Sequence, residues 1–182
     1  IGISRTPVRE AVIQLSEESR IIEIFPQRGM RIALIDVDLV EEARFLRLVL
    51  EKAAVELVCG QADEEDLQWL DENIRLQEFY LEGGSSRKLL ELDNEMHRKL
   101  FSICRKELTY EMCQRLAIHY DRIRSLSVAA VKDHKIIEDH KKLLEAIRSR
   151  DKKKAAETMD LHLNRWMMNE QMFRAQYPQY FK

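Results

Sequence analysis

Hydrophobic residues recur at helical spacing from the first residues of the chain onward. Val8, Val12 and Leu15 form one apolar stripe, and Arg5 lies on a different face of the same helical projection. Pro7 falls in the first turn, where its missing N–H costs little. We therefore predict a helix over residues 4–18.

The pattern then changes to a weak alternation of apolar and polar residues over 21–24, which resumes over 30–32. Between these stretches Pro26 and Gly29 supply residues that favour a turn. The sequence therefore predicts a short β-hairpin that carries Arg28 at its tip.

From residue 36 onward every segment has the helical period. The predicted helices cover residues 39–58, 63–81, 85 or 86–104, 108–131, 133 or 134–148, and 151–176. The inward face of the first is expected to hold Leu46, Leu50, Ala53, Ala54 and Leu57. Gly60 is expected to end that helix. Because the loops are short, we predict an all-α fold, an antiparallel bundle of six to seven helices.

Composition supports this interpretation. Hydrophobic residues make up 45% of the 182 residues and charged residues 34%, which suits amphipathic helices with salt-bridged outer faces. Five glycines and three prolines are too few for a many-turned β-fold. The net charge is −2, and residues 1–35 carry five arginines against four glutamates. Any nucleic-acid contact would therefore be local and made by a few positioned arginines.

The cysteines are three in number and lack C-x-x-C spacing, which argues against a disulfide framework and fits the reducing cytoplasm. No apolar run has the length of a membrane span. We therefore expect a cytoplasmic protein without a membrane partner.

Two groups of motifs resemble one family of proteins. The segment Ile3-Ser4-Arg5-Thr6-Pro7-Val8-Arg9-Glu10-Ala11, with Gln27-Arg28-Gly29, resembles the recognition helix and wing of GntR-type bacterial transcription regulators. Residues 36–182 resemble their helical FCD effector domain through Arg47-x-x-Leu50-Glu51, Asp93-x-x-x-His97, Asp139-His140 and Met159-x-x-His162. Residues 1–35 would then be a partial winged helix-turn-helix, because only three residues precede the recognition helix and the bracing helix is missing.

The resemblance implies a homodimeric repressor or activator that binds operator DNA and is modulated by a small metabolite, often a carboxylate. The residues expected to contact DNA are Ser4, Arg5, Thr6, Arg9, Arg28 and Gly29. Arginine paired with guanine is a common specific contact, and serine and threonine hydroxyls suit phosphates. Whether this chain binds DNA is left open by the missing brace.

Four spaced residues are candidate metal ligands. Asp93 and His97 lie four apart and project from one helix face, whereas His140 and His162 lie on two further helices. A bundle can point ligands inward from several helices, but a single helical histidine is more often a surface or satisfied core residue. The resemblance implies that all four bind a divalent metal, and their donor atoms suit Zn, Ni, Mn or Fe. His119 and His134 are expected at the surface.

A carboxylate ligand needs a cation beside the metal. Arg47 lies in an otherwise apolar helix face and is the first candidate, although it could instead pair with Glu51, four residues on. Arg44 and Arg122 are weaker candidates that could equally be solvated.

Two other classes of function compete. A metalloenzyme could activate water at a site of three histidines and one aspartate. We expect no enzyme, because the sequence offers no convincing general base and no other catalytic motif. A helical scaffold whose inward polar residues satisfy one another is the third possibility.

Overall fold

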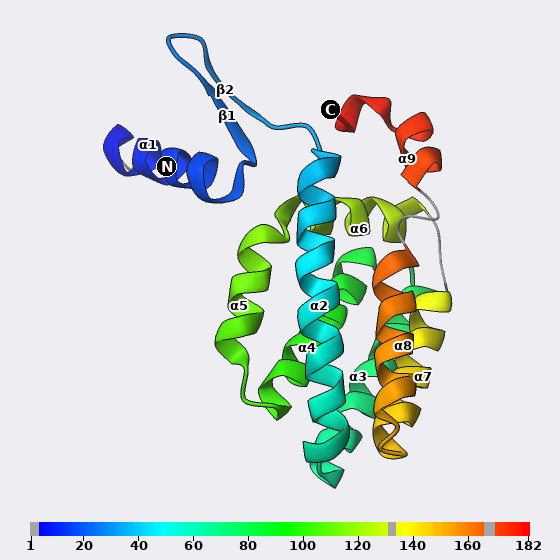
Figure 1. Ribbon diagram of the computed structural model, residues 1–182. Coiled ribbons are helices and arrows are strands. Elements are labelled where there is room, and N and C mark those ends of the chain that lie inside the picture. Colours follow the sequence, from blue (N-terminus) through cyan, green and yellow to red (C-terminus); the bar gives the residue numbers. More distant parts are fainter. Residues whose placement is uncertain (1–3, 131–133, 166–169) are drawn as a thin grey trace.

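The computed structural model of the chain describes residues 4–130, 134–165 and 170–182. Within these residues, a helix and a two-stranded antiparallel hairpin precede a bundle of seven helices, and a short helix follows it (Figure 1). In chain order the elements are α1 (Arg5–Ser19), β1 (Ile22–Phe25), β2 (Gly29–Ile32), α2 (Val37–Gln61), α3 (Glu64–Glu82), α4 (Ser86–Ile103), α5 (Glu107–Leu116), α6 (Ile118–Ala130), α7 (Lys135–Arg148), α8 (Lys152–Asn164) and α9 (Glu170–Gln176). The predicted all-α bundle is confirmed.

Local signals in the sequence explain several helix ends. Asp63 caps α3 in a capping box with Asp66, and Asp151 caps α8 by accepting from the backbone N–H of Lys154. Gly83 ends α3, as predicted. Gly60 does not end α2, which continues to Gln61 because the helical hydrogen bonds carry on to the cap residue after it.

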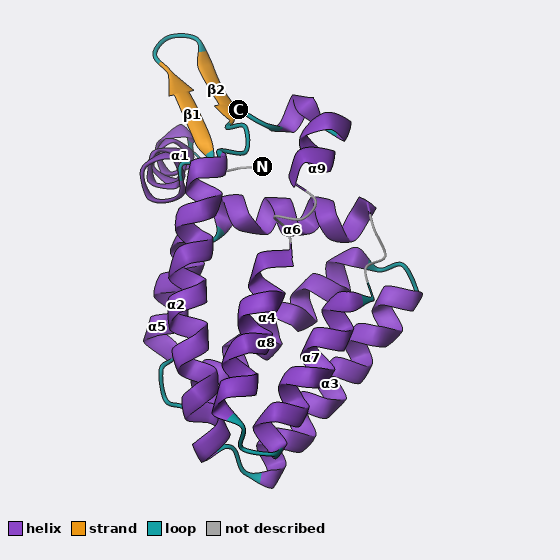
Figure 2. Ribbon diagram, turned by 45° about the vertical axis from the view of Figure 1, so that its right-hand side comes forward, coloured by secondary structure: helices purple, strands orange, loops and turns teal. Residues whose placement is uncertain are grey.

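The predicted helix over 108–131 is two helices in the structure. The chain turns at the buried Ala117, and α6 then lies across one end of the bundle, between the bundle and the hairpin (Figures 1 and 2). This turn lets Tyr120 and Ile123 enter a second core cluster. Val131, the predicted helix end, and Asp133, the alternative start of the next helix, lie outside the described residues.

The predicted last helix over 151–176 is also divided. Helix α8 ends at Asn164, and α9 is a separate helix at the end of the bundle near the hairpin (Figure 1). The prediction also covered residues 166–169, which lie outside the described part of the chain.

Two apolar cores hold these elements together. The larger core fills the bundle and includes Leu70, Ile74, Leu100, Leu143, Ile147 and Met159. The smaller core joins the start of α2, α6 and the C-terminal segment through Ile35, Val40, Ala43, Tyr120, Ile123, Phe173 and Phe181. The C-terminal segment is therefore packed on the linker that leads from the hairpin into the bundle, where Ile35 and Phe181 form a parallel bridge.

The predicted hairpin is confirmed, with Phe25 paired to Gly29 across the turn. Gly29 has φ +106°, which a glycine adopts readily. Helix α1 buries no residue, and Val8 and Leu15 of its apolar stripe are about half exposed. Within the described residues, no helix is both long and apolar enough to cross a membrane.

Candidate metal centre and ligand pocket

The structure brings the four predicted ligands together from three helices. Asp93 and His97 come from α4, His140 from α7 and His162 from α8. One ligand atom of each lies within 4.8 Å of those of the other three. His162 Nε2 lies 3.2 Å from His97 Nε2 and 3.4 Å from His140 Nε2. The Asp93 oxygens lie 3.6 Å from His97 Nε2 and 3.5 Å from His140 Nε2.

These separations fit a single divalent cation. A metal bonded to two imidazole nitrogens at about 2.1 Å holds them roughly 3.0 Å apart at a right angle and roughly 3.4 Å apart at the tetrahedral angle. Three imidazole nitrogens and one carboxylate form a donor set that suits Zn, Ni, Mn or Fe. A metal site requires such a convergence of ring nitrogens.

The His140 ring is held in the tautomer that frees Nε2. The side-chain NH2 group of Asn73 donates to the Leu92 carbonyl oxygen at 3.1 Å, which fixes the orientation of the Asn73 side chain. The side-chain oxygen of Asn73 therefore faces Gln77 and accepts from the NH2 group of Gln77 at 2.7 Å. The remaining oxygen of Gln77 lies 2.9 Å from His140 Nδ1 and must accept from it. The Nε2 lone pair of His140 therefore points into the cluster.

The His97 ring is oriented by a buried carboxylate. Glu51 on α2 accepts from His97 Nδ1 through one oxygen and from Arg47 Nε, at 2.6 Å, through the other. Burial alone would raise the pKa of Glu51, but Arg47 and His97 lower it to about 2. The alternative that Arg47 pairs with Glu51 is thus confirmed. Through Glu51 the pair also orients the ring of His97, one of the candidate metal ligands.

Two of the imidazoles are set to be neutral. Burial lowers the pKa of His140 to about 4, and it holds the pKa of His162 well below its ordinary value, with the neighbouring histidines adding to the effect. His162 Nδ1 is buried and has no hydrogen-bond partner among the described residues. Both rings therefore present lone pairs near neutral pH, which is the form that binds a metal.

Sequence reasoning missed Arg124 and Arg165. Arg124 on α6 pairs with the candidate ligand Asp93, and also with Asp121 at 2.8 Å. Burial would raise the pKa of Asp93, but Arg124 and the three histidines hold it well below the usual range. Arg165 binds the fully buried Asp139 through two nitrogens. Both arginines fall inside predicted amphipathic helices, where a charged residue is expected to face water, so the sequence gave no signal of this placement.

A cavity of about 50 Å³ adjoins the cluster. Its lining includes Asp93, Tyr120, Arg124, Ser127, His162 and Arg165. Arg47 is fully buried, packs against the Tyr120 ring, and has one guanidinium nitrogen, Nη2, without a hydrogen-bond partner among the described residues. The cavity is thus lined by two candidate metal ligands, Asp93 and His162, and by two arginines, Arg124 and Arg165. A third arginine, Arg47, lies beside the cavity against the Tyr120 ring.

The structure does not bring Arg44 and Arg122 to this cavity. Arg44 binds Glu41 and Asn164, at 2.8 and 2.7 Å, so its hydrogen bonds fix α2 to α8. Arg122 donates to the Ala33 carbonyl oxygen. His119, expected at the surface, is only 2% exposed because it is enclosed where α5 and α6 meet the linker, whereas His134 is exposed as predicted.

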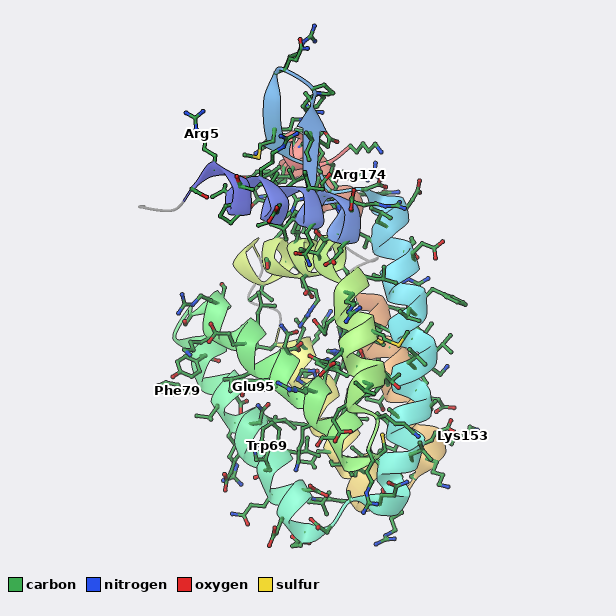
Figure 3. All side chains as sticks on the ribbon, turned by 90° about the vertical axis from the view of Figure 1, so that its left-hand side faces the viewer. Arg5, Trp69, Phe79, Glu95, Lys153 and Arg174 are labelled. Atoms are coloured by element: carbon green, nitrogen blue, oxygen red, sulfur yellow. The ribbon has the colours of Figure 1, made fainter. Side chains whose placement is uncertain are left out.

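The candidate DNA contacts lie together at the far end of the molecule from the bundle core. Ser4, Arg5, Thr6 and Arg9 are exposed at the start of α1, and Arg28 and Gly29 are exposed at the hairpin tip. Figure 3 shows the Arg5 side chain extending away from the rest of the protein. These residues are free to meet a partner.

A helix and hairpin with exposed arginines, joined to a helical bundle that encloses four candidate ligands, fit the architecture of a transcription regulator. Residues 42–165 match the FCD domain, so the chain belongs to the FCD-domain family of GntR-type transcription regulators. It is 29% identical over 163 residues to the HTH-type transcriptional repressor RspR of Escherichia coli K12, covering 89% of this chain and 71% of RspR. It is 27% identical over 169 residues to the HTH-type transcriptional regulator YdhC of Bacillus subtilis, covering 90% and 73%.

Solved structures agree on the fold. E. coli McbR/YncC superposes with a TM-score of 0.78 at 20% identity, over 99% of this chain and 88% of that one. A GntR protein of Streptococcus agalactiae gives a TM-score of 0.55 at 26% identity, over 88% and 80%. These relatives are transcription regulators and not enzymes, so the metalloenzyme alternative gains no support.

Proposed function

We propose that the protein is a ligand-responsive, DNA-binding transcription regulator whose helical domain holds a divalent metal through Asp93, His97, His140 and His162. The observation that carries this proposal is the convergence of four ligand atoms, with the far ring nitrogens of His97 and His140 already hydrogen-bonded. When bound, the metal would supply a Lewis acid that accepts an oxygen of the ligand.

The ligand is a small carboxylate that occupies the cavity beside His162. Arg124 and Arg165 line this cavity, and a guanidinium group binds a carboxylate through two parallel hydrogen bonds. Arg47, whose Nη2 lacks a partner in the described part of the chain, remains a candidate anchor beneath Tyr120. A volume of about 50 Å³ favours a molecule of few atoms unless lining side chains move.

Operator DNA binds the exposed surface formed by the start of α1 and the hairpin tip. Arg5 and Arg9, which are exposed on α1, contact base edges, where one bidentate contact to guanine contributes roughly 1–3 kcal/mol of discrimination. Arg28 and Gly29, at the hairpin tip, suit the minor groove or the phosphate backbone. The relatives, which carry the name of helix-turn-helix regulators, support this assignment.

A second copy of the chain covers an apolar face of the bundle. Helices α2 and α5 lie side by side, and both expose large hydrophobic residues (Figure 1). These residues, which we call the α2–α5 face, are Phe45, Val49, Leu57, Leu108, Met112 and Leu116. Their exposed parts amount to on the order of 500 Å², as large as the biggest patch on a typical monomer. A homodimer would bury this face and present two DNA-binding segments to two half-sites.

Metal content tests the proposal. The wild-type protein, incubated with Zn²⁺ and desalted, is expected to retain one zinc per chain by elemental analysis. His140→Ala removes a ligand and should reduce the retained zinc at least tenfold, whereas His134→Ala, at an exposed histidine, should not change it. Equal zinc content in wild type and His140→Ala would overturn the assignment.

DNA selection tests the other half of the function. The protein is incubated with a pool of random duplexes, and the bound sequences are recovered. Arg9→Ala is expected to abolish enrichment of any sequence, whereas Arg98→Ala, at an exposed arginine on α4, retains it. Unchanged enrichment with Arg9→Ala would contradict its role in reading the operator.

A further inference from the structure

Helix α6 has two functional sides. Tyr120, Arg124 and Ser127 line the ligand cavity. At 100° per residue, Arg122 projects from the opposite side of the helix, and His119 projects from the flank between the two sides. Figures 1 and 2 place α6 between the bundle helices and the segment that carries the hairpin. One rigid element therefore faces both the ligand cavity and the connection to the DNA-binding segment.

His119 holds the point where the linker enters the bundle. Its Nδ1 accepts from the backbone N–H of Asp36 at 3.2 Å, and the ring is 2% exposed. Asp36 is the N-cap residue of α2 and accepts from the N–H of Asp38 at 3.1 Å. A displacement of His119 therefore reaches the first turn of α2 and the linker in front of it.

Arg122 holds the linker three residues earlier, at the base of the hairpin. Its Nη1 donates to the Ala33 carbonyl oxygen at 2.8 Å. The N–H of Ala33 in turn donates to the Ile21 carbonyl oxygen at 2.8 Å, which extends the pairing of β1 and β2 by one step. Arg122 is thus one hydrogen bond away from the hairpin that carries Arg28.

The cavity side of α6 contacts the candidate metal cluster through Arg124. Arg124 pairs with Asp93, the carboxylate among the four candidate metal ligands. A divalent cation would compete with Arg124 for the charge of Asp93, and a ligand carboxylate would offer Arg124 a new partner. Tyr120 and Ile123 are packed in the smaller core, which holds α6 against the start of α2.

We propose that α6 couples the ligand cavity to the DNA-binding segment, and that His119 and Arg122 are the residues through which it positions the linker, residues 33–36. This inference rests on the proposed function, because it requires that the cluster binds a metal. His119 and Arg122 are positioning residues that touch neither metal nor ligand.

Hydrogen–deuterium exchange with Zn²⁺ alone as the probe tests the coupling. In the wild type, Zn²⁺ is expected to change the exchange rate of amides in residues 33–40 by roughly fivefold, the lower end of common coupling energies. In His119→Ala and Arg122→Ala, that change should be lost while calorimetry still detects Zn²⁺ binding. Arg98→Ala, on the exposed face of α4, is the control that keeps the wild-type response.

Conservative variants separate coupling from folding. The side-chain oxygen of asparagine takes the place of histidine Nδ1, so His119→Asn keeps the acceptor for Asp36, and Arg122→Lys keeps a donor for Ala33. Both should restore the Zn²⁺ response, which a loss of stability in the alanine variants would not explain. The coupling is overturned if the wild type binds Zn²⁺ without a change in the exchange rates of the linker amides. It is also overturned if both alanine variants show the full wild-type change in these rates. Absence of Zn²⁺ binding overturns the proposed function and this inference with it.

Discussion

The Glu51→Ala substitution should destabilise the protein far more than an ordinary surface substitution. Glu51 and Arg47 are each only 2% exposed, and Glu51 also accepts from His97 Nδ1. Removing the carboxylate leaves the guanidinium buried and still charged, because arginine does not deprotonate in proteins. Breaking a buried ion pair in this way costs about 3–5 kcal/mol.

The pKa of Glu51 gives a similar magnitude. A lowering from 4.5 to about 2 favours the charged form by about 3 kcal/mol. This stabilisation is present above pH 4.5, the ordinary value, and is lost as the pH falls toward 2. The two lines of reasoning agree that Glu51→Ala should lower the free energy of unfolding at pH 7 by about 3 kcal/mol or more.

Urea unfolding followed by circular dichroism measures this loss, and Glu157→Ala is the matched control. Glu157 also follows its basic partner, Lys153, by four residues, but the two side chains are 67% and 87% exposed. Such a pair contributes less than about 0.5 kcal/mol. If Glu51→Ala is no more destabilising than Glu157→Ala, Glu51 does not compensate the buried charge of Arg47.

A metal affinity that falls about 10–100-fold in Glu51→Gln would show that the same carboxylate also orients His97.

Two further predictions concern pH and assembly. Without metal, the free energy of unfolding should decrease as the pH falls from 6.5 toward 4, because the unfolded chain protonates His140 before the folded chain does. In urea titrations at several pH values, His140→Ala should flatten this pH dependence. An unchanged slope in His140→Ala would argue against a lowered pKa of His140. Met112→Glu on the α2–α5 face should give a monomer by light scattering, whereas Phe79→Glu, exposed on α3, should stay dimeric; a dimeric Met112→Glu protein would exclude that face.

Much of the fold was predictable because its signals are local. Asp63 and Asp151 cap helices by bonds within four residues, and the turn of the hairpin is encoded by Pro26 and Gly29. The turn at Ala117 had no such signal, because neither glycine nor proline marks it. The chain turns there so that Tyr120 can pack on residues distant in the sequence.

The inward face of α2 shows why the site was only partly predictable. Apolar spacing placed Ala53 and Leu57 inside, yet both are exposed, and Leu57 is 42% exposed. Ala54 is buried as predicted, but Arg47 and Glu51 also take buried positions of α2. There Glu51 accepts from His97 and pairs with the Arg47 guanidinium. Hydrophobic periodicity assumes that charged residues face water, and it fails where buried charges serve a site.

The charges around the cluster favour an order in which the metal precedes the anion. Three ion pairs surround the histidines, and in each the carboxylate is almost fully buried: Arg47–Glu51, Arg124–Asp93 and Arg165–Asp139. Two of the pairs are balanced in themselves, whereas Arg124 of the third also pairs with Asp121, which is 35% exposed. His140 and His162 favour the neutral form, because burial lowers the pKa of both. A divalent cation therefore adds positive charge that this buried site does not fully compensate, which is costly until an anion arrives. By linkage, a carboxylate should bind the metal-loaded protein more tightly than the metal-free protein, and should raise metal affinity by the same factor.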